Sequence, residues 1–196
     1  MTSPAAVVES SWWNVPNQIT LGRLLLSLII FLTLELQWYW VAAVLFVLAA
    51  GTDWVDGYWA RRYGQVTRLG RILDPFVDKF LICGVFIYLA AIPEARVYGW
   101  VAVIITAREL LVTALRGEIE GRGGDFSARW SGKWKMALQC VAAGMVLGGL
   151  AVWGEDAPAG WRWAVTAGVT LAVLITIHSG YDYVVAAMRL LRQPQA

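Results

Sequence analysis

Apolar runs separated by short polar segments fill most of this chain, and the pattern predicts helices that cross a lipid bilayer. A helix spans a bilayer core with about 17–25 predominantly apolar residues. Six helices of this kind are predicted, over residues 20–36, 39–61, 68–91, 98–115, 133–153 and 161–190. The fold class expected from the pattern is an all-α integral membrane protein with six transmembrane helices.

The N-terminal segment, residues 1–16, lacks a long apolar run and is expected to form a short helix on the membrane surface. Trp12, Trp13 and Val15 give this segment an apolar side. Trp is favoured at the boundary between lipid and water. The predicted organisation is therefore an interfacial segment over residues 1–16, followed by one six-helix domain over residues 17–192.

Charged residues are few, and their distribution predicts the orientation of the chain in the membrane. Of the 196 residues, 59% are hydrophobic and 15% are charged, whereas a soluble domain carries about 25% charged residues. Basic residues gather on one side of the predicted bundle, at Arg61, Arg62, Arg68, Arg71, Arg116, Arg122, Arg129, Lys133, Lys135, Arg189 and Arg192. Because cytoplasmic loops carry the excess of Lys and Arg, both termini are expected in the cytoplasm. The expected location is a bacterial inner (plasma) membrane.

Four aspartates stand near the cytoplasmic ends of the second and third predicted helices. At a helix centre each would cost about 2.5–3.5 kcal/mol, so acids in membrane helices are candidates for function. Asp53 and Asp56 are three residues apart, which places them on one face of their helix. Asp74 and Asp78 are four residues apart and share a face in the same way. Because the link over residues 62–67 is short, we expect antiparallel neighbouring helices whose carboxylates converge.

Converging carboxylates with no His or Cys nearby favour a hard divalent cation such as Mg²⁺, Mn²⁺ or Ca²⁺. The small residues Gly57, Ala60 and Gly70 beside the acids let a ligand approach the backbone. Two other interpretations remain open. The acids form part of an ion pathway through the membrane, or they belong to an internal salt-bridge network with Arg61, Arg62, Arg68, Arg71 and Lys79.

The four acids belong to a longer pattern of fixed spacing. It reads Asp53-x-x-Asp56-Gly57-x-x-Ala60-Arg61, then eight residues, then Gly70-x-x-x-Asp74-x-x-x-Asp78. This pattern resembles the signature of the CDP-alcohol phosphatidyltransferases at every fixed position. The resemblance extends over most of the chain, because residues 15–23, 106–116 and 132–139 are similar to segments of the phosphatidylglycerophosphate synthases of that family.

The resemblance implies a six-helix membrane fold, a homodimer and a reaction that depends on Mg²⁺ or Mn²⁺. It assigns the role of general base to Asp78. It assigns metal binding to Asp53, Asp56, Asp74 and Asp78. It assigns binding of the donor, CDP-diacylglycerol, to Asp56, Gly57, Ala60, Arg61 and Gly70.

A second cationic cluster is a candidate site for the acceptor alcohol. Arg108 and Arg116 are eight residues apart and lie on roughly one helix face. Several cations at close range suit a phosphate, so sn-glycerol 3-phosphate fits as the acceptor. An internal ion pair of Arg108 with Glu109, or a plain excess of basic residues on the cytoplasmic side, is the alternative. The complete set of acceptor candidates is Arg108, Arg116, Lys133, Lys135 and Gln139.

The residues and the resemblance together predict an enzyme that transfers the phosphatidyl group of CDP-diacylglycerol to sn-glycerol 3-phosphate. The products are phosphatidylglycerophosphate and CMP, and the reaction belongs to phospholipid biosynthesis. The same chemistry with phosphatidylglycerol, serine or inositol phosphate as acceptor is the alternative within this class. From a different class, a divalent-cation transporter that uses the same acids remains open. Membrane lipid is an expected partner, and nucleic acid is not.

Overall fold

The computed structural model describes residues 15–63, 70–121 and 130–191. Within these residues the secondary structure consists of six α-helices and two short 3-10 helices, with no strand, which confirms the predicted all-α class. The α-helices are α1 (Val15–Glu35), α2 (Tyr39–Tyr63), α3 (Gly70–Ala91), α4 (Gly99–Gly121), α5 (Trp130–Trp153) and α6 (Ala159–Leu191). The 3-10 helices are η1 (Pro93–Ala95) and η2 (Gly154–Asp156).

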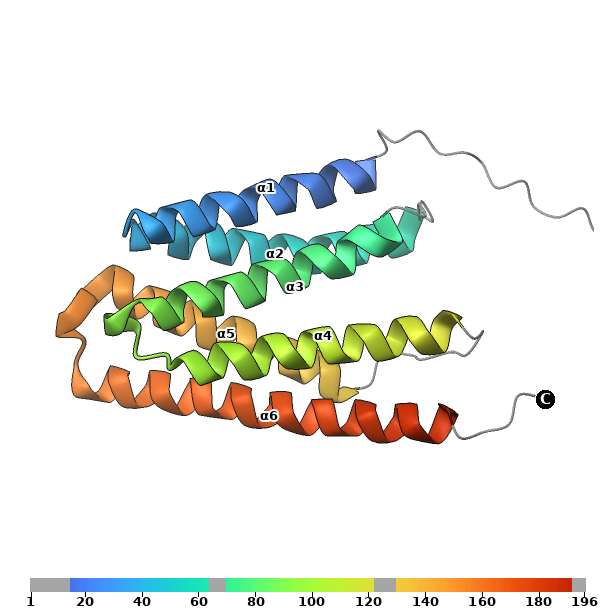
Figure 1. Cartoon of the computed structure of the whole chain (residues 1–196). Helices are drawn as coiled ribbons and strands as arrows, with labels where there is room; N and C mark the ends of the chain where they lie inside the picture. The colour runs from blue at the N-terminus through green and yellow to red at the C-terminus, as the bar shows by residue number, and fades with distance from the viewer. Residues whose placement is uncertain (1–14, 64–69, 122–129, 192–196) are drawn as a thin grey trace, which may run out of the picture.

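The six α-helices lie side by side in one elongated bundle (Figure 1). Consecutive helices run in opposite directions, so α2 and α3 are antiparallel, as the sequence predicted. The start of α1 and the end of α6 lie at the same end of the bundle. We call this the motif end, because α2 ends there and α3 begins there. An even number of antiparallel helices accounts for this arrangement.

The two helices that carry the aspartate pattern are held by their neighbours on the bundle. Residue contacts join α1 to both α2 and α3, and they join α5 to the same two helices. α4 contacts α3 and α6, and α5 also contacts α6. Each of the two motif helices is thus positioned by α1 and by α5.

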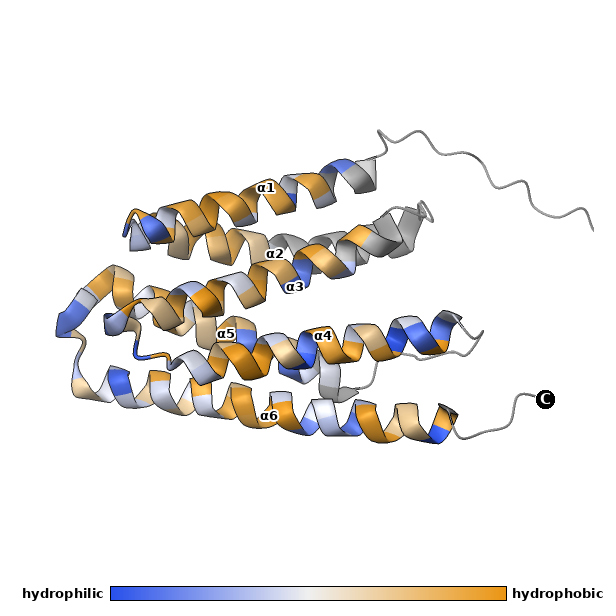
Figure 2. Cartoon of the chain, viewed as in Figure 1, coloured by the Kyte–Doolittle hydropathy of each residue, from blue (hydrophilic) through white to orange (hydrophobic). Residues whose placement is uncertain are grey.

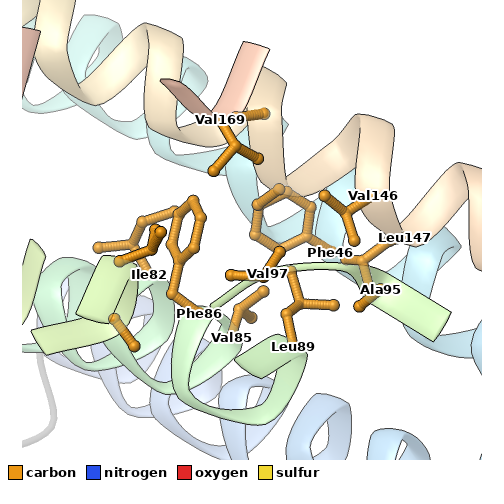
Figure 3. Packing of buried hydrophobic residues seen from close by; sticks show 14 of the residues in the cluster. Phe46, Ile82, Val85, Phe86, Leu89, Ala95, Val97, Val146, Leu147 and Val169 are labelled. Carbon is orange, nitrogen blue, oxygen red and sulfur yellow. The ribbon is translucent and has the colours of Figure 1, made fainter. Parts of the chain in front are cut away.

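The buried core consists of aliphatic and aromatic side chains from all six α-helices, and Figure 3 shows part of it. Phe46 of α2 and Phe86 of α3 are both almost fully buried. They belong to one cluster with Leu147 of α5 and Val169 of α6. Close van der Waals packing of this kind is a main force between helices in a membrane. It fixes the depth of α3, and therefore the depth of the residues that α3 carries toward the motif end.

Apolar residues make up much of the length of the helices (Figure 2). Large apolar side chains such as Leu25, Val47 and Leu110 are more than half exposed. Helices that are hydrophobic on all sides are typical of membrane spans. Two helices in the described part, Trp134–Asp156 and Ala159–Leu190, are long and apolar enough to cross a membrane. Six membrane spans remain a prediction.

The links at the far end of the bundle are tight, which keeps successive helices close together. After α1, Gln37 adopts a left-handed conformation with φ of 59°. The Gln37 amide donates to the Leu34 carbonyl oxygen at 3.0 Å, and the Trp38 amide donates to the Thr33 carbonyl oxygen at 2.8 Å. These two bonds form a Schellman motif, which satisfies carbonyl groups that the helix end would leave unpaired.

Two helix boundaries differ from the predicted ones by five residues or more, and the others agree within three residues. α1 begins at Val15, so Val15 and Pro16 belong to this helix rather than to a separate interfacial segment. Pro is tolerated in the first turn of a helix, where its missing N–H group has no partner to lose. α4 continues to Gly121 instead of ending at residue 115. Residues 1–14, which make up the rest of the predicted interfacial segment, lie outside the described residues.

Candidate active site

The aspartate pattern lies on the backbone of α2 and α3 at the motif end. The last turns of α2 carry the first half of the pattern, and the first turns of α3 carry the second half (Figure 1). The side chains of most of these residues are outside the described part, so their predicted roles stay predictions. This applies to Asp53, Asp56, Gly57, Ala60, Arg61, Gly70 and Asp74.

Asp78 is the one acid of the pattern whose side chain is described. Its Oδ1 accepts a hydrogen bond from Nη1 of Arg23 on α1, at 2.6 Å. The Arg23 side chain is 8% exposed and the Asp78 side chain is 28% exposed. Charge-assisted hydrogen bonds of this length are strong and directional. The pair therefore links α1 to α3 and orients the carboxylate that the sequence singled out as a base.

A metal site is not visible among the described side chains, which contain no group of three or more His, Cys, Asp or Glu residues that could hold an ion. Three of the four predicted ligands, Asp53, Asp56 and Asp74, are outside that set. The predicted metal site is therefore untested by this structure.

A buried charge network lies between α4, α5 and α6. Glu109 accepts from Nη1 of Arg108 at 3.1 Å and also from the ammonium of Lys135, both at Oε1. Nη2 of Arg108 donates to Oγ of Ser179 at 2.6 Å. The Arg108 guanidinium also lies over the Tyr183 ring, 5.2 Å from its centroid. Arg108 is thus held in place by contacts to its own helix and to α6.

A pocket of about 260 Å³ opens next to this network. Its wall comes from α3, α4, α5 and α6, and six of the lining residues are Lys79, Arg108, Val112, Arg116, Met136 and Tyr183. Within the described part, Nε of Arg108 and Nε of Arg116 are buried donors with no hydrogen-bond partner. Buried donors are nearly always paired, so two unused ones on cationic side chains indicate room for an anionic ligand.

Comparison with known proteins identifies the family. The profile of the CDP-alcohol phosphatidyltransferases matches residues 13–187. This chain belongs to that family. The finding confirms the family predicted from the aspartate pattern, and it makes the protein a membrane-bound transferase of phospholipid synthesis. Enzymes of this family generally use a divalent metal ion.

Three curated relatives of this phosphatidyltransferase carry the same functional name. The CDP-diacylglycerol–glycerol-3-phosphate 3-phosphatidyltransferase of Bacillus subtilis is 35% identical over 150 residues, which cover 69% of this chain and 77% of the relative. The protein of the same name from Escherichia coli K12 is 34% identical over 189 residues, covering 89% of this chain and 95% of the relative. The protein of the same name from Salmonella choleraesuis is 33% identical over 189 residues, covering 89% of this chain and 95% of the relative.

The predicted acceptor residues whose side chains are described fall into two groups. Arg108 and Arg116 line the pocket. Lys135 is buried against Glu109, and Gln139, fully buried, donates from Nε2 to Oγ1 of Thr176 at 2.8 Å. The side chain of Lys133 is outside the described part. Direct contact of the acceptor with any of them remains a prediction.

The alternative of an internal ion pair between Arg108 and Glu109 is observed, and it coexists with the pocket. Sequence reasoning missed Lys79 and Tyr183 as lining residues. The available signal for Lys79 was its position directly after Asp78. Tyr183 gave no signal, because an aromatic residue in an apolar helix is indistinguishable from a core residue by sequence.

Proposed function

We propose that this chain transfers the phosphatidyl group of CDP-diacylglycerol to sn-glycerol 3-phosphate and releases CMP. Membership of the CDP-alcohol phosphatidyltransferase family supports the reaction type. The curated relatives over most of the chain are named for this donor and this acceptor. The product is phosphatidylglycerophosphate.

The cationic pocket between α3, α4, α5 and α6 is the observation that carries the acceptor assignment. Lys79, Arg108 and Arg116 bring three cationic side chains to its wall. The unused Nε donors of Arg108 and Arg116 add hydrogen-bonding capacity for an anion. Arginine matches phosphate geometry through its planar fork of donors, and lysine adds a point charge. These features favour a small phosphorylated alcohol over serine, which carries no phosphate.

The donor and its metal belong at the motif end. Asp53, Asp56, Asp74 and Asp78 would hold a divalent ion, and Mg²⁺ or Mn²⁺ fits a donor set made only of carboxylate oxygens. A bound divalent ion polarises phosphoryl oxygens and stabilises a departing phosphate. The donor CDP-diacylglycerol would lie against Asp56, Gly57, Ala60, Arg61 and Gly70.

The chain's own residues carry the proton transfer. Asp78 takes the proton from the acceptor hydroxyl, and the oxygen attacks the phosphorus atom nearest the diacylglycerol. The bond between that phosphorus and the CMP phosphate oxygen breaks, so CMP leaves. Arg23 holds Oδ1 of Asp78 through the 2.6 Å contact, which fixes the direction of the carboxylate. Holding the base and the acceptor together in this way lowers the entropic part of the barrier.

The proposed setting is a bacterial inner membrane, crossed six times, with both termini and the active site facing the cytoplasm. The excess of Lys and Arg at the motif end supports this orientation. The many large apolar side chains exposed on the bundle support burial in lipid. We further propose a homodimer, as the family resemblance implies.

An acceptor panel tests the proposal. Purified protein in detergent, with CDP-diacylglycerol and Mg²⁺ or Mn²⁺, is given sn-glycerol 3-phosphate, serine, inositol phosphate or phosphatidylglycerol, and CMP release is followed. We expect release with sn-glycerol 3-phosphate. Release with a different acceptor alone would keep the chemistry and overturn the acceptor assignment. No release with any acceptor would favour the cation transporter, which proteoliposomes loaded with a Mn²⁺-sensitive dye would then detect.

A further inference from the structure

Lys79 is the residue that follows the predicted base and one of the cations that line the pocket. It follows Asp78 directly on α3, and its side chain lines the pocket together with Arg108 and Arg116. Successive residues of a helix are about 1.5 Å apart along the axis, so these two side chains leave α3 at nearly the same depth, Asp78 toward Arg23 of α1 and Lys79 toward Thr113 of α4. Lys79 therefore belongs both to α3, the helix that carries the predicted base, and to the cationic wall of the pocket.

The contact that holds Lys79 is a neutral one. Its ammonium donates to Oγ1 of Thr113 on α4. The Thr113 hydroxyl donates its own hydrogen to the backbone oxygen of Glu109 at 2.7 Å, so it can only accept from Lys79. In the part of the chain that is described, Lys135 and Arg108 instead contact the carboxylate of Glu109. Among the described residues, no carboxylate forms an ion pair with the ammonium of Lys79.

We propose that Lys79 leaves Thr113 to bind the acceptor phosphate, and that its place beside Asp78 sets the distance between this phosphate and the base. The proposal rests on the proposed function. In sn-glycerol 3-phosphate the phosphate and the reacting hydroxyl are at opposite ends of a short carbon chain, so the two groups that hold them must be close together. Lysine suits this movement because its ammonium sits on a flexible stem with three donors.

The test compares Lys79→Met, which keeps the apolar stem without the charge, with Lys79→Arg. For Lys79→Met we expect the KM for sn-glycerol 3-phosphate to rise by about tenfold to a hundredfold, because the loss of one charged hydrogen bond weakens binding by about this factor. The KM for CDP-diacylglycerol stays at the wild-type value. Inorganic phosphate, used as a competitor of the acceptor, inhibits the variant more weakly. Lys79→Arg restores inhibition by phosphate but not the full kcat, because its longer fork holds the phosphate at a different distance.

Thr113→Val separates binding from structural support. If Lys79 uses Thr113 only while the site is empty, this variant keeps the wild-type KM for the acceptor or lowers it. A rise equal to that of Lys79→Met would overturn the proposal, because Lys79 would then act through its contact with Thr113. The matched control is Arg189→Met, which removes an exposed cation near the end of α6 and leaves both KM values unchanged.

Wild-type values for acceptor KM and for phosphate inhibition in Lys79→Met would also overturn the proposal, and so would equal rises in the KM of both substrates. A failure of the proposed function looks different. In that case the wild-type protein itself does not release CMP with sn-glycerol 3-phosphate.

Discussion

Glu109 is the buried acid that balances two buried cations, and replacing it by Gln should destabilise the bundle. Glu109 is 3% exposed, Lys135 is 3% exposed and Arg108 is 8% exposed. Both cations contact Oε1 of Glu109. Glu109→Gln keeps the shape of the side chain but leaves two positive charges facing each other without their counter-charge.

The magnitude follows from the burial of all three groups. Removing one partner of a buried ion pair costs about 3–5 kcal/mol, because the remaining charge is left uncompensated. For a chain of 150–250 residues, each kcal/mol lowers Tm by about 2–4 °C, so Tm should fall by roughly 6–20 °C. We expect the same variant to lower the affinity for the acceptor, since Arg108 loses one of the contacts that orient it in the pocket.

The assay is thermal unfolding of the purified variant in detergent, followed by circular dichroism of the helices. Glu120→Gln is the control, because Glu120 is exposed on the last turn of the same helix. It should unfold within about 1–2 °C of the wild type, as exposed substitutions change stability little. A Glu109→Gln variant as stable as this control would refute the reasoning that one acid neutralises the network.

A second substitution tests the cause of the effect. Lys135→Met removes one of the two cations and fills its space with an unbranched apolar side chain. Combined with Glu109→Gln, it should recover part of the lost stability, because the double variant buries one uncompensated charge fewer. Groups in direct contact commonly show interaction energies of about 0.5–3 kcal/mol in such a cycle. Strictly additive losses would mean that the two residues do not stabilise each other.

Three further predictions concern the base, the metal and the core. Asp78→Asn should lower kcat by about a hundredfold to ten thousandfold, the usual contribution of a general base, while binding of CDP-diacylglycerol persists; near-normal turnover would remove Asp78 from this role. EDTA should abolish CMP release, and Mg²⁺ or Mn²⁺ should restore it; activity that survives chelation would argue against a metal held by the four aspartates. Gly84→Ala should destabilise by about 1–3 kcal/mol through overpacking, because its Cβ would lie 2.1 Å from Cζ of Phe31; an unchanged unfolding temperature would show that the Phe31 ring moves aside freely.

The helices were predictable because each combines apolar composition with sufficient length. The end of α4 was not, since hydropathy reports where an apolar run stops and not where the helix stops. α4 continues for more than one turn as a polar helix that carries the exposed residues Glu118 and Glu120. Within this extension Ile119 is buried in a small cluster with Val112, Tyr183 and Ala187, a tertiary contact that hydropathy along the sequence does not reveal.

The chemistry of the site was predictable where it depends on local spacing. The family followed from the aspartate pattern, and the comparison confirmed it. The pair of Arg23 with Asp78 was not predicted, because it joins residues 55 positions apart and depends on how α1 packs on α3. The position of Gln139 was likewise beyond sequence reasoning, because its contact with Thr176 depends on how α5 packs on α6.

The most direct test of the account follows the acceptor carbon into lipid. The purified protein receives CDP-diacylglycerol, a divalent metal and ¹³C-labelled sn-glycerol 3-phosphate, and the lipids are analysed by mass spectrometry while CMP is quantified. We expect labelled phosphatidylglycerophosphate in an amount equal to the CMP released, and neither product when the acceptor is omitted. CMP release without labelled lipid would indicate hydrolysis of the donor and would contradict the account.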